Sequence, residues 1–426
     1  MIRRAVLVLA AAGVLGGSAG ADAPCDPVAP GEALQARLDA APPGSALCLG
    51  PGRHDGPLHI RRSLSLRGPR EAVIGSRGEG STVTLEAEGA ELIGVTVDGS
   101  GGRFDLLDAA IRVGADSVRV EDVAVRHALF GILVERASGV VLRGNTVEGN
   151  PDAPLGMRGD GIRLWEVRGS RIESNRVSDS RDVVVWYSPG NHIVGNRVER
   201  GRYGTHLMYS HGNEIAGNVF VENVVGVFAM YSRELAIRGN LLARSSGAAG
   251  VGFGAKESSG LEVSGNWFVA NTVGSYLDNS PLEPSLENRF SANVFRFSEA
   301  AIVFHGVAGG NRFESNSFRD NRTPVRVEGR GDALDAAWRG NHYGDYAGYD
   351  FDGDGMGDLP YELRSLSSTL ESRRPALAFF RGTPAMELVE LAGEALPLFR
   401  PRTLLVDPEP RMQSSLPRLP ALSDEG

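Results

Sequence analysis

The sequence lacks the features that mark several common classes of protein. It has only two cysteines and no basic excess, since 44 Lys and Arg stand against 53 Asp and Glu, for a formal net charge of −9. Binding to a phosphate backbone needs basic patches, so this balance argues against nucleic acid as a partner. No stretch beyond the N-terminal segment approaches the roughly 18 consecutive apolar residues of a membrane helix. The 56 glycines follow no strict three-residue period, which excludes collagen and indicates many tight turns.

What is present suits a large folded domain that is exported. The chain has 426 residues, of which 42% are hydrophobic and 23% charged, so wholesale disorder is excluded. Residues 1–21 combine Arg3 and Arg4, an apolar run and the small-residue cleavage site Ala19-Gly20-Ala21. This is the pattern of a secretory signal peptide. Losing its two arginines would take the net charge from −9 to −11.

Cys25 and Cys48 both lie near the start of the predicted mature chain. In an oxidising compartment we expect them to form a disulfide, which would close a loop of about 22 residues and contribute roughly 3 kcal/mol. A cysteine pair that binds a metal is the alternative.

A repeat with a period near 22 residues determines the expected fold. Five segments align without gaps, each ends in Asn, and looser copies continue to Asn341. The segments are 131–145, 161–175, 182–196, 204–218 and 226–240. Within them apolar residues recur at every second position, as in strands. Three short inward-facing strands per repeat, separated by Gly and Asn corners, describe one coil of a right-handed parallel β-helix. Leucine-rich repeats need several leucines at fixed offsets, which are missing.

The expected fold is therefore all-β, a right-handed parallel β-helix solenoid whose coils stack at roughly 4.8 Å per step. The recurrent Asn is expected at a corner, where side-chain amides bond from coil to coil. A short amphipathic helix within 32–41, with Leu34 and Leu38 on one face, is expected to cap the N-terminal end. The expected divisions are a signal peptide (1–21), an N-terminal cap (22–45), the β-helix (46–345), a C-terminal cap with an Asp-rich loop (346–375) and a non-repeat docking tail with a disordered end (376–426).

One outward face of the repeated strand carries an unusual set of side chains. Alternation along a strand puts positions two and four of each segment outside. Position four reads Glu135, Trp165, Trp186, Met208 and Met230, and then, less regularly, Lys256, Asp278 and His305. Position two reads Leu133, Arg163, Val184, His206 and Phe228. Position five stacks Tyr187, Tyr209 and Tyr231, which alternation places inward or at the corner.

A docking surface for another protein is one interpretation of this face, because exposed aromatic and Met clusters mark interfaces. The expected contact residues are Trp165, Trp186, Phe228 and His305. An ordinary surface without a role is a further alternative.

A soft-metal site is the sharper interpretation. Met208 and Met230 occupy one column on adjacent coils, so their Cβ atoms should lie about 5 Å apart, with His206 roughly 7 Å from Met208. Thioethers favour Cu(I), and imidazole accepts either copper state. These three side chains could form a weak site suited to handing a metal on, with His211, just past the corner, as the candidate fourth ligand.

An acidic segment near the end of the repeat resembles the oxygen-ligand loop of a calcium site. Its carboxylates are Asp350, Asp352, Asp354 and Asp358. The position of the last ligand in a standard EF-hand is Tyr361 here, so that motif is not met. Structural calcium and a metal-free Gly/Asp turn both remain open, and either would brace the C-terminal cap.

Catalysis on acidic polysaccharides is the third possibility, because enzymatic β-helices use clustered carboxylates or a basic group with a carboxylate in a groove. The candidates are Asp160, Arg163, Asp182 and His192. The two aspartates stand at corners, where Asp is a normal turn residue, and no Asp-Pro-His-Asp run of the epimerase type is present.

Seven stretches from residue 158 onward carry a family resemblance. They are RGDGIRLW (158–165), SRDVVVWYS (180–188), GRYGTHLMYSHGN (201–213), NVVGVFAMYS (223–232), FRDNRTPVRVEGRGDAL (318–334), YAGYDFDGDGMGDLPYELRSLS (346–367) and ALAFFRGTPA (376–385). Through these stretches the sequence resembles the NosD family, the periplasmic maturation factors of nitrous oxide reductase.

This resemblance implies a non-enzymatic periplasmic protein that sits beside an ABC transporter made of an ATPase and a membrane subunit. It implies a role in denitrification, in which copper is received from a membrane-anchored chaperone lipoprotein and supplied, transiently and as Cu(I), for the copper–sulfur cluster of nitrous oxide reductase. The ligand set of Met208, Met230, His206 and His211 still depends on the column argument. The tail with Phe379 and Phe380 is expected to dock onto the transporter. A metal-free docking scaffold for the reductase or chaperone, or a polysaccharide lyase or epimerase, are the alternatives.

Overall fold

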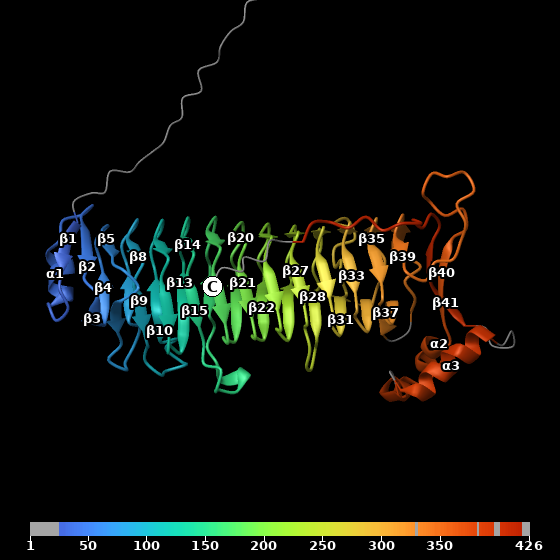
Figure 1. The fold of residues 1–426 in the computed structure, drawn as a ribbon, viewed down its shortest axis with the longest axis horizontal. Coiled ribbons are helices and arrows are strands. Elements are labelled where there is room, and N and C mark those ends of the chain that lie inside the picture. Colours follow the sequence, from blue (N-terminus) through green and yellow to red (C-terminus); the bar gives the residue numbers. More distant parts are fainter. Residues whose placement is uncertain (1–24, 329–330, 381–382, 396–400, 420–426) are drawn as a thin grey trace, which may run out of the picture.

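Three parallel sheets run side by side along the molecule, and each coil of the chain adds one short strand to each sheet (Figure 1). The computed structural model describes residues 25–419, except 329–330, 381–382 and 396–400. The predicted signal peptide, and residues 420–426 of the predicted disordered end, therefore lie outside the described residues. The arrangement confirms the predicted parallel β-helix.

The 14-stranded sheet begins with the strand that carries Cys25. In spatial order it contains β1 (Cys25–Val28), β2 (Ala46–Leu49), β5 (Ser65–Arg67), β8 (Glu91–Ile93), β11 (Arg119–Glu121), β14 (Val141–Arg143), β17 (Arg171–Glu173), β20 (His192–Val194), β23 (Glu214–Ala216), β26 (Ala236–Arg238), β29 (Glu262–Ser264), β32 (Asn288–Ser291), β35 (Asn311–Glu314) and β38 (Ala337–Arg339).

The 12-stranded sheet carries the outward face singled out from the sequence. It contains β4 (Leu58–Ile60), β7 (Val83–Leu85), β10 (Ala109–Val113), β13 (Phe130–Glu135), β16 (Ile162–Trp165), β19 (Asp182–Trp186), β22 (Tyr203–Met208), β25 (Val225–Met230), β28 (Val251–Lys256), β31 (Val273–Asp278), β34 (Ala300–His305) and β37 (Thr323–Glu328).

The 13-stranded sheet forms the remaining side. It contains β3 (Gly52–Asp55), β6 (Ala72–Gly75), β9 (Thr96–Asp98), β12 (Ala124–Arg126), β15 (Thr146–Glu148), β18 (Arg176–Ser178), β21 (Arg197–Glu199), β24 (Val219–Val221), β27 (Leu241–Ala243), β30 (Trp267–Val269), β33 (Val294–Arg296), β36 (Ser317–Arg319) and β39 (His342–Tyr343).

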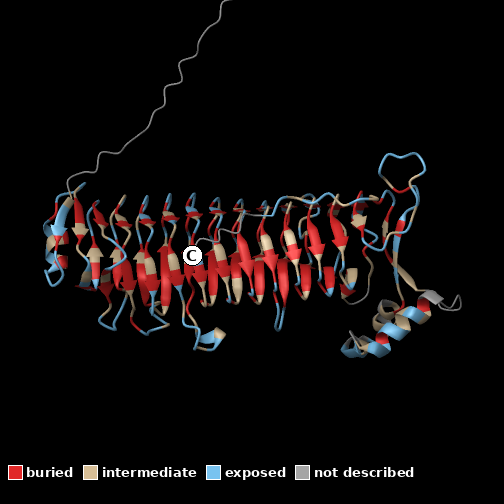
Figure 2. Cartoon of the chain, in the orientation of Figure 1, coloured by how far each residue is buried: buried red, intermediate tan, exposed pale blue. Residues whose placement is uncertain are grey.

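The apolar side chains of all three sheets point into one shared core, which Figure 2 shows as a buried band along the whole solenoid. Ile172, Ile193, Ile215 and Ile237 form one buried column, as the repeat predicts. Towards the C-terminal end aromatic rings replace the aliphatic side chains. Phe295, for example, stacks between Phe268 and Phe318 with ring-centroid distances of 4.5 and 5.2 Å.

An asparagine ladder occupies the corner between the 14-stranded and 13-stranded sheets. Its buried members are Asn145, Asn175, Asn196, Asn218, Asn240, Asn266, Asn293, Asn316 and Asn341. Each amide before Asn341 donates to the Oδ1 of the next Asn, as from Asn196 to Asn218 at 3.0 Å, and to a carbonyl of the preceding coil, as from Asn218 to Ile193 at 2.8 Å. The ladder therefore satisfies buried backbone and side-chain groups together.

Both ends of the solenoid are closed. At the N-terminal end α1 (Leu34–Ala40) buries Leu34 and Leu38 against the first coils, as predicted. The disulfide between Cys25 and Cys48, also predicted, joins β1 to β2. At the C-terminal end Tyr361 stacks on Tyr343 with ring centroids 3.7 Å apart.

The C-terminal segments form one unit on the last coil. The strands β40 (Tyr361–Ser365) and β41 (Arg402–Asp407) form a two-stranded antiparallel sheet. The chain between these two strands contains the helices α2 (Leu366–Arg373), η2 (Pro375–Phe380) and α3 (Pro384–Ala395). Figure 1 shows these helices projecting at the C-terminal end. Residues 408–419 then run back along the solenoid, where the Trp267 indole donates to the Pro417 carbonyl at 3.3 Å. None of the helices in the described part of the chain has the length and apolar character needed to span a membrane.

Replacing a ladder asparagine should destabilise the solenoid strongly. Asn218→Ala removes the two donations of this amide, to Asn240 and to the Ile193 carbonyl. It also removes the acceptor of the Asn196 backbone N–H and of one Asn196 side-chain N–H in a buried corner. We expect a loss of at least about 3 kcal/mol in the free energy of unfolding, measured by denaturant titration. Arg238→Ala, which breaks an exposed ion pair with Glu262, is the matched control and should cost less than about 1 kcal/mol. Equal losses in the two variants would contradict the structural role of the ladder.

Candidate functional site

Strand register places the predicted column of outward side chains on the 12-stranded sheet. Trp165 pairs with Trp186, Trp186 with Met208, and Met208 with Met230. The column continues through Lys256, Asp278 and His305, as the looser alignment predicts. We call Trp165, Trp186, Tyr203, His206, Met208, Phe228 and Met230, on β16, β19, β22 and β25, the aromatic–methionine face.

A bulge gives this face a residue that the repeat does not reveal. The register between β19 and β22 shifts by one residue, so that Tyr203 pairs with Asp182 while His206 pairs with Val184. The extra residue turns Tyr203 to the same side as His206, and their ring centroids are 4.6 Å apart. The sequence carries one signal of this insertion, because the ladder spacing grows from 21 to 22 residues between Asn196 and Asn218.

Position two of the repeat is less exposed than alternation predicts, which corrects the expectation of an open face. Leu133 and Val184 are fully buried, and His206 is only 7% exposed. Leu133 lies under Phe104 and Leu107 of the preceding loop. His206 is buried by aromatic side chains.

His206 is enclosed by rings of three neighbouring strands. Its ring centroid lies 5.4 Å from that of Trp186 and 6.4 Å from that of Phe228, in addition to the contact with Tyr203. Burial lowers the pKa of His206 to about 4, so the imidazole is neutral at pH 7. Its Nδ1 atom is buried without a hydrogen-bond partner among the described residues.

The structure joins His206 to one of the two methionines of the column. The Nε2 atom of His206 lies 3.3 Å from the Sδ atom of Met230, on the adjacent strand. Two ligand atoms that each bind the same metal ion at about 2.0–2.3 Å are separated from one another by about as much as this Nε2–Sδ distance. The pair therefore has a spacing that fits a hydrogen bond and also fits two ligands of one metal ion. Met208 and Met230 are both half-buried.

The contacts of His211 do not join it to this pair. It lies in the turn after β22, where its Nδ1 atom accepts a hydrogen bond from the backbone N–H of Arg233 at 3.1 Å. Of the four predicted ligands, the structure therefore brings His206 and Met230 into contact and places Met208 beside Met230 in register, while His211 bonds elsewhere.

The tyrosines of position five lie at the corner, one of the two places predicted for them. Tyr187, Tyr209 and Tyr231 have positive φ angles of 53°, 49° and 50°. Their rings stack with centroids 5.4 and 5.0 Å apart, and Tyr187 and Tyr209 are exposed. Because the rings cover one another, this tyrosine stack presents ring edges and hydroxyl groups to solvent.

Comparison with known proteins identifies the family. Residues 152–348 match the family described as "Periplasmic copper-binding protein (NosD)". The chain is 30% identical over 392 residues, 88% of each chain, to a Pseudomonas aeruginosa protein named "Probable ABC transporter binding protein NosD". The chain belongs to the NosD family. A Stutzerimonas stutzeri protein of the same name is 29% identical over 372 residues, which is 82% of this chain and 83% of that one.

Solved structures similar to this NosD-family chain share its fold. The A-module of the Azotobacter vinelandii mannuronan C-5 epimerase AlgE6 has a TM-score of 0.57 at 17% identity, over 74% of this chain and 94% of that chain. The catalytic domain of a GH87 α-1,3-glucanase reaches 0.50 at 12% identity, over 71% and 64%. At these identities the likeness shows a β-helix and carries no enzymatic activity to this chain. The family description and the disulfide both agree with a periplasmic location.

Of the four residues considered for polysaccharide chemistry, Asp160, Arg163 and Asp182 lie in one ion-pair cluster, and His192 lies apart from them on another sheet. Buried Asp160 pairs with Arg163 at 3.0 Å and with Arg181 at 2.9 Å, and buried Asp182 pairs with Arg202. His192 lies on β20 of the 14-stranded sheet and bonds to Glu214. These carboxylates therefore hold the coils of this NosD-family protein together.

The Asp-rich loop brings three of its four carboxylates together. Oxygen atoms of Asp350, Asp352 and Asp358 lie within 4.8 Å of one another, whereas Asp354 instead accepts the N–H of Met356. Each of the three also accepts a backbone N–H of the loop, as a metal-free turn would require. Calcium here therefore stays a prediction.

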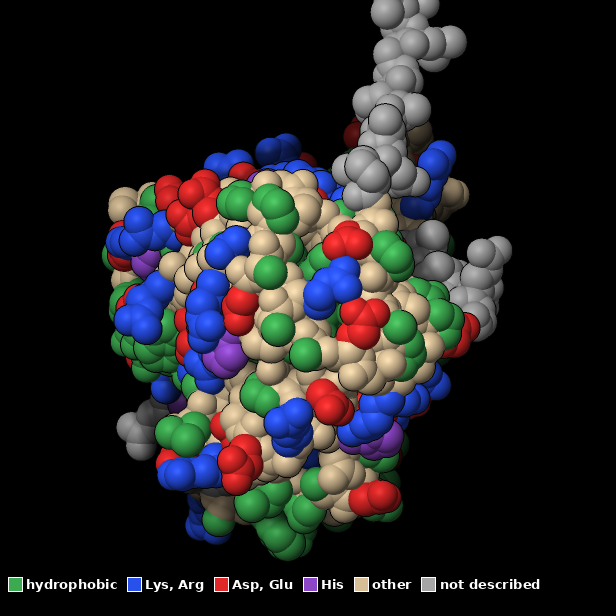
Figure 3. All heavy atoms as spheres, turned by 90° about the vertical axis from the view of Figure 1, so that its left-hand side faces the viewer, with side chains coloured by type: hydrophobic (Ala, Val, Ile, Leu, Met, Phe, Trp, Pro, Cys, Tyr) green, Lys and Arg blue, Asp and Glu red, His purple; other side chains and the backbone are tan. Residues whose placement is uncertain are grey.

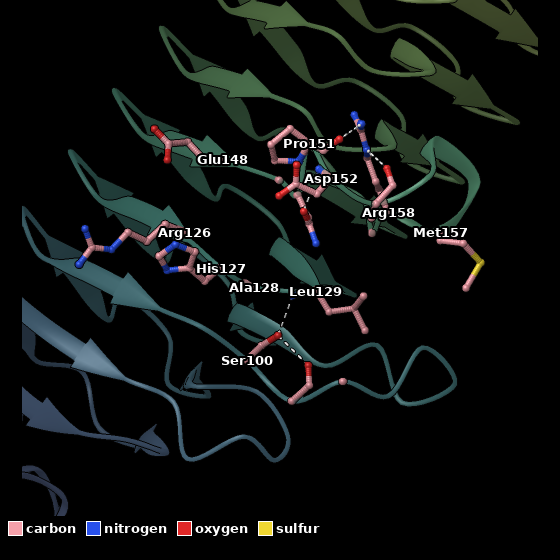
Figure 4. A pocket seen from close by; sticks show the side chains of 16 residues that line it. Ser100, Arg126, His127, Ala128, Leu129, Glu148, Pro151, Asp152, Met157 and Arg158 are labelled. Carbon is pink, nitrogen blue, oxygen red and sulfur yellow. Dashed lines mark hydrogen bonds between the residues drawn. The ribbon is translucent and has the colours of Figure 1, made fainter.

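An open cavity of about 630 Å³ lies towards the N-terminal side of the face (Figure 4). It is formed by the loops at 100–102, 126–129, 148–153 and 157–159. Figure 4 shows Arg158 bonded within this wall, where it donates to the Pro151 and Ala153 carbonyls. The described residues that line it include none of the candidate site residues. Seen from the N-terminal end, acidic and basic side chains are interspersed around the molecule (Figure 3).

His206 should make stability depend on pH. Its folded pKa of about 4 lies below the ordinary 6.5, so the unfolded chain takes up a proton in this interval that the folded chain does not. Stability is therefore lost as the pH falls from 6.5 towards 4, and we expect His206 to account for about 2 kcal/mol between pH 7 and 4.5. The measurement is denaturant unfolding of the wild type and His206→Gln at both pH values. Parallel pH dependence of the two proteins would rule out the buried neutral imidazole.

Proposed function

We propose that this protein is the periplasmic accessory subunit of an ABC transporter and relays copper for the maturation of nitrous oxide reductase. The observation that carries the proposal is the 3.3 Å contact between His206 Nε2 and Met230 Sδ, with Met208 beside it in register. The description of the family as copper-binding, and the relatives' names as probable ABC transporter binding proteins, support it.

The donor set favours Cu(I) as the cargo. Thioether sulfur is a soft ligand that prefers Cu(I), and a neutral imidazole needs no deprotonation at pH 7 before it binds. Because all three side chains stand on hydrogen-bonded strands, the donors are positioned before the metal arrives. Three donors without a cysteine thiolate make a modest site, which suits a protein that passes its metal on.

The C-terminal unit is the proposed contact with the transporter's membrane subunit. Phe379 is 87% exposed, and Phe380, Leu388 and Leu391 are also exposed on η2 and α3. Apolar side chains grouped on a projecting element are typical of an interface. The face with the copper donors lies on a separate part of the chain, so the copper chaperone lipoprotein and the reductase would meet this protein there.

Copper affinity should depend on the two methionines. We expect the mature protein to bind Cu(I) under anaerobic conditions in competition with a chromogenic chelator, and Met208→Leu/Met230→Leu to bind at least about tenfold more weakly. Leucine conserves side-chain volume, so packing changes little. Met157→Leu, at an exposed methionine of η1 (Leu155–Met157), is the matched control and should keep wild-type affinity. An unchanged affinity in the double variant would remove this site.

A metal-free docking scaffold is the second candidate function, favoured by the tyrosine stack, in which Tyr187 and Tyr209 are exposed. Under the relay proposal, capture of the copper chaperone by the immobilised protein should fall when a Cu(I) chelator is present. Tyr187→Ala/Tyr209→Ala should leave copper affinity unchanged. Full capture under chelator that is lost in the tyrosine variant would favour docking over relay.

A further inference from the structure

The side chain of Trp186 lies next to the proposed copper donors, and its ring N–H makes no hydrogen bond among the described residues. It pairs in register with Met208 and lies at 89° to the His206 ring. Its Nε1 atom is buried with no hydrogen-bond partner among the described residues. A buried tryptophan N–H usually finds an acceptor, so this position is not explained by hydrogen bonding.

Packing on the N-terminal side fixes the ring instead. The Arg163 guanidinium lies 5.0 Å from the Trp186 ring and 5.2 Å from the Trp165 ring, and Asp160 holds it through a 3.0 Å ion pair. Trp186 therefore lies between a cation on β16 and the sulfur and nitrogen donors on β22. A ring held in this way is preorganised for a ligand on the donor side.

Ion pairs largely balance the charges near the ring, so the indole face itself is what a cation on the donor side would meet. Three arginines, Arg163, Arg181 and Arg202, pair with two buried aspartates, Asp160 and Asp182, which leaves a net charge of 3 − 2 = +1 in this cluster. The indole face attracts cations and is polarisable, which suits a soft monovalent ion.

We infer that Trp186 forms the aromatic wall of the copper site, contacts the bound Cu(I) directly and favours monovalent over divalent ions. This inference rests on the proposed function, because it needs a metal at His206 and Met230. It adds a fourth contact that is neither sulfur nor nitrogen and that the sequence pattern alone assigns to a docking surface.

Tryptophan fluorescence tests the inference on the mature, full-length protein. Trp186 is one of four tryptophans, so we expect Cu(I), and the redox-stable monovalent ion Ag(I), to quench part of the emission at one equivalent, with no quenching by Zn²⁺. The quenching should vanish in Trp186→Leu and persist in Trp165→Phe. Trp186→Leu should also bind Ag(I) about tenfold more weakly.

Folding and binding are checked separately, so that each outcome decides. Circular dichroism of Trp186→Leu should match the wild type. If that variant loses its strand signal, Trp186→Phe replaces it, and the same disappearance of quenching is expected. This inference alone would be overturned if Trp186→Leu had wild-type Cu(I) affinity in the chelator competition and one of two fluorescence results were seen. Either the wild-type emission does not respond to the metal, or the emission of Trp186→Leu is quenched as much as that of the wild type. Absence of Cu(I) and Ag(I) binding by the wild type would overturn the proposed function and the inference together.

Discussion

The coil-to-coil register is the constraint on which the rest of the structure depends. Parallel strands hold each coil over the next one, and the asparagine ladder repeats the same hydrogen bonds at one corner. Because each coil is held over the next, a residue type that recurs about every 22 residues becomes a column on one face, and the shift between β19 and β22 leaves the column of Trp186 and Met208 in register. Met208 and Met230 are close because they hold the same place in adjacent coils, and not because a loop folds back to bring them together.

The ladder also has a direction. One N–H of each ladder amide donates towards the C-terminal end, the other donates back to a carbonyl of the preceding coil, and the oxygen accepts from the N-terminal side. The amide-to-amide bonds therefore all run in one direction and reinforce one another. The last acceptor is Asp407 of β41, whose Oδ2 atom receives the N–H and the side-chain amide of Asn341 at 3.0 and 2.9 Å. A carboxylate accepts without donating onward, so it fits the positive end of the series. The same residue ties the C-terminal unit to the solenoid.

The features predicted from the sequence are those that repeat. The inward columns, the Asn corner, the order of residues down the outer face and the capping helix with Leu34 and Leu38 all follow from periodicity, and the disulfide follows from compartment and cysteine count. Structural features that occur only once leave no periodic pattern in the sequence. The bulge that turns Tyr203 outward, the loop that covers Leu133 and the pairing of β40 with β41 each occur once, and they depend on contacts between distant residues.

The candidate site shows the same division. Alternation placed His206 on the correct side of the strand, but its 7% exposure arises from the neighbouring rings of Trp186, Tyr203 and Phe228, which only three-dimensional packing defines. The position of His211, the predicted fourth ligand, was the least predictable part. His211 follows the corner, where the chain direction changes, and column reasoning does not extend past that point.

The placement of the donors on paired strands has a consequence for how a metal ion would leave. Hydrogen bonds on both edges hold β22 and β25, so the ligand cage has no hinge that could swing it open. A protein that receives the metal would have to approach from the solvent side and replace the ligands one at a time. Both proteins would then bind the metal together before the last thioether sulfur dissociates. The rate of metal transfer would then depend on the geometry of the receiving protein more than on conformational motion of the solenoid.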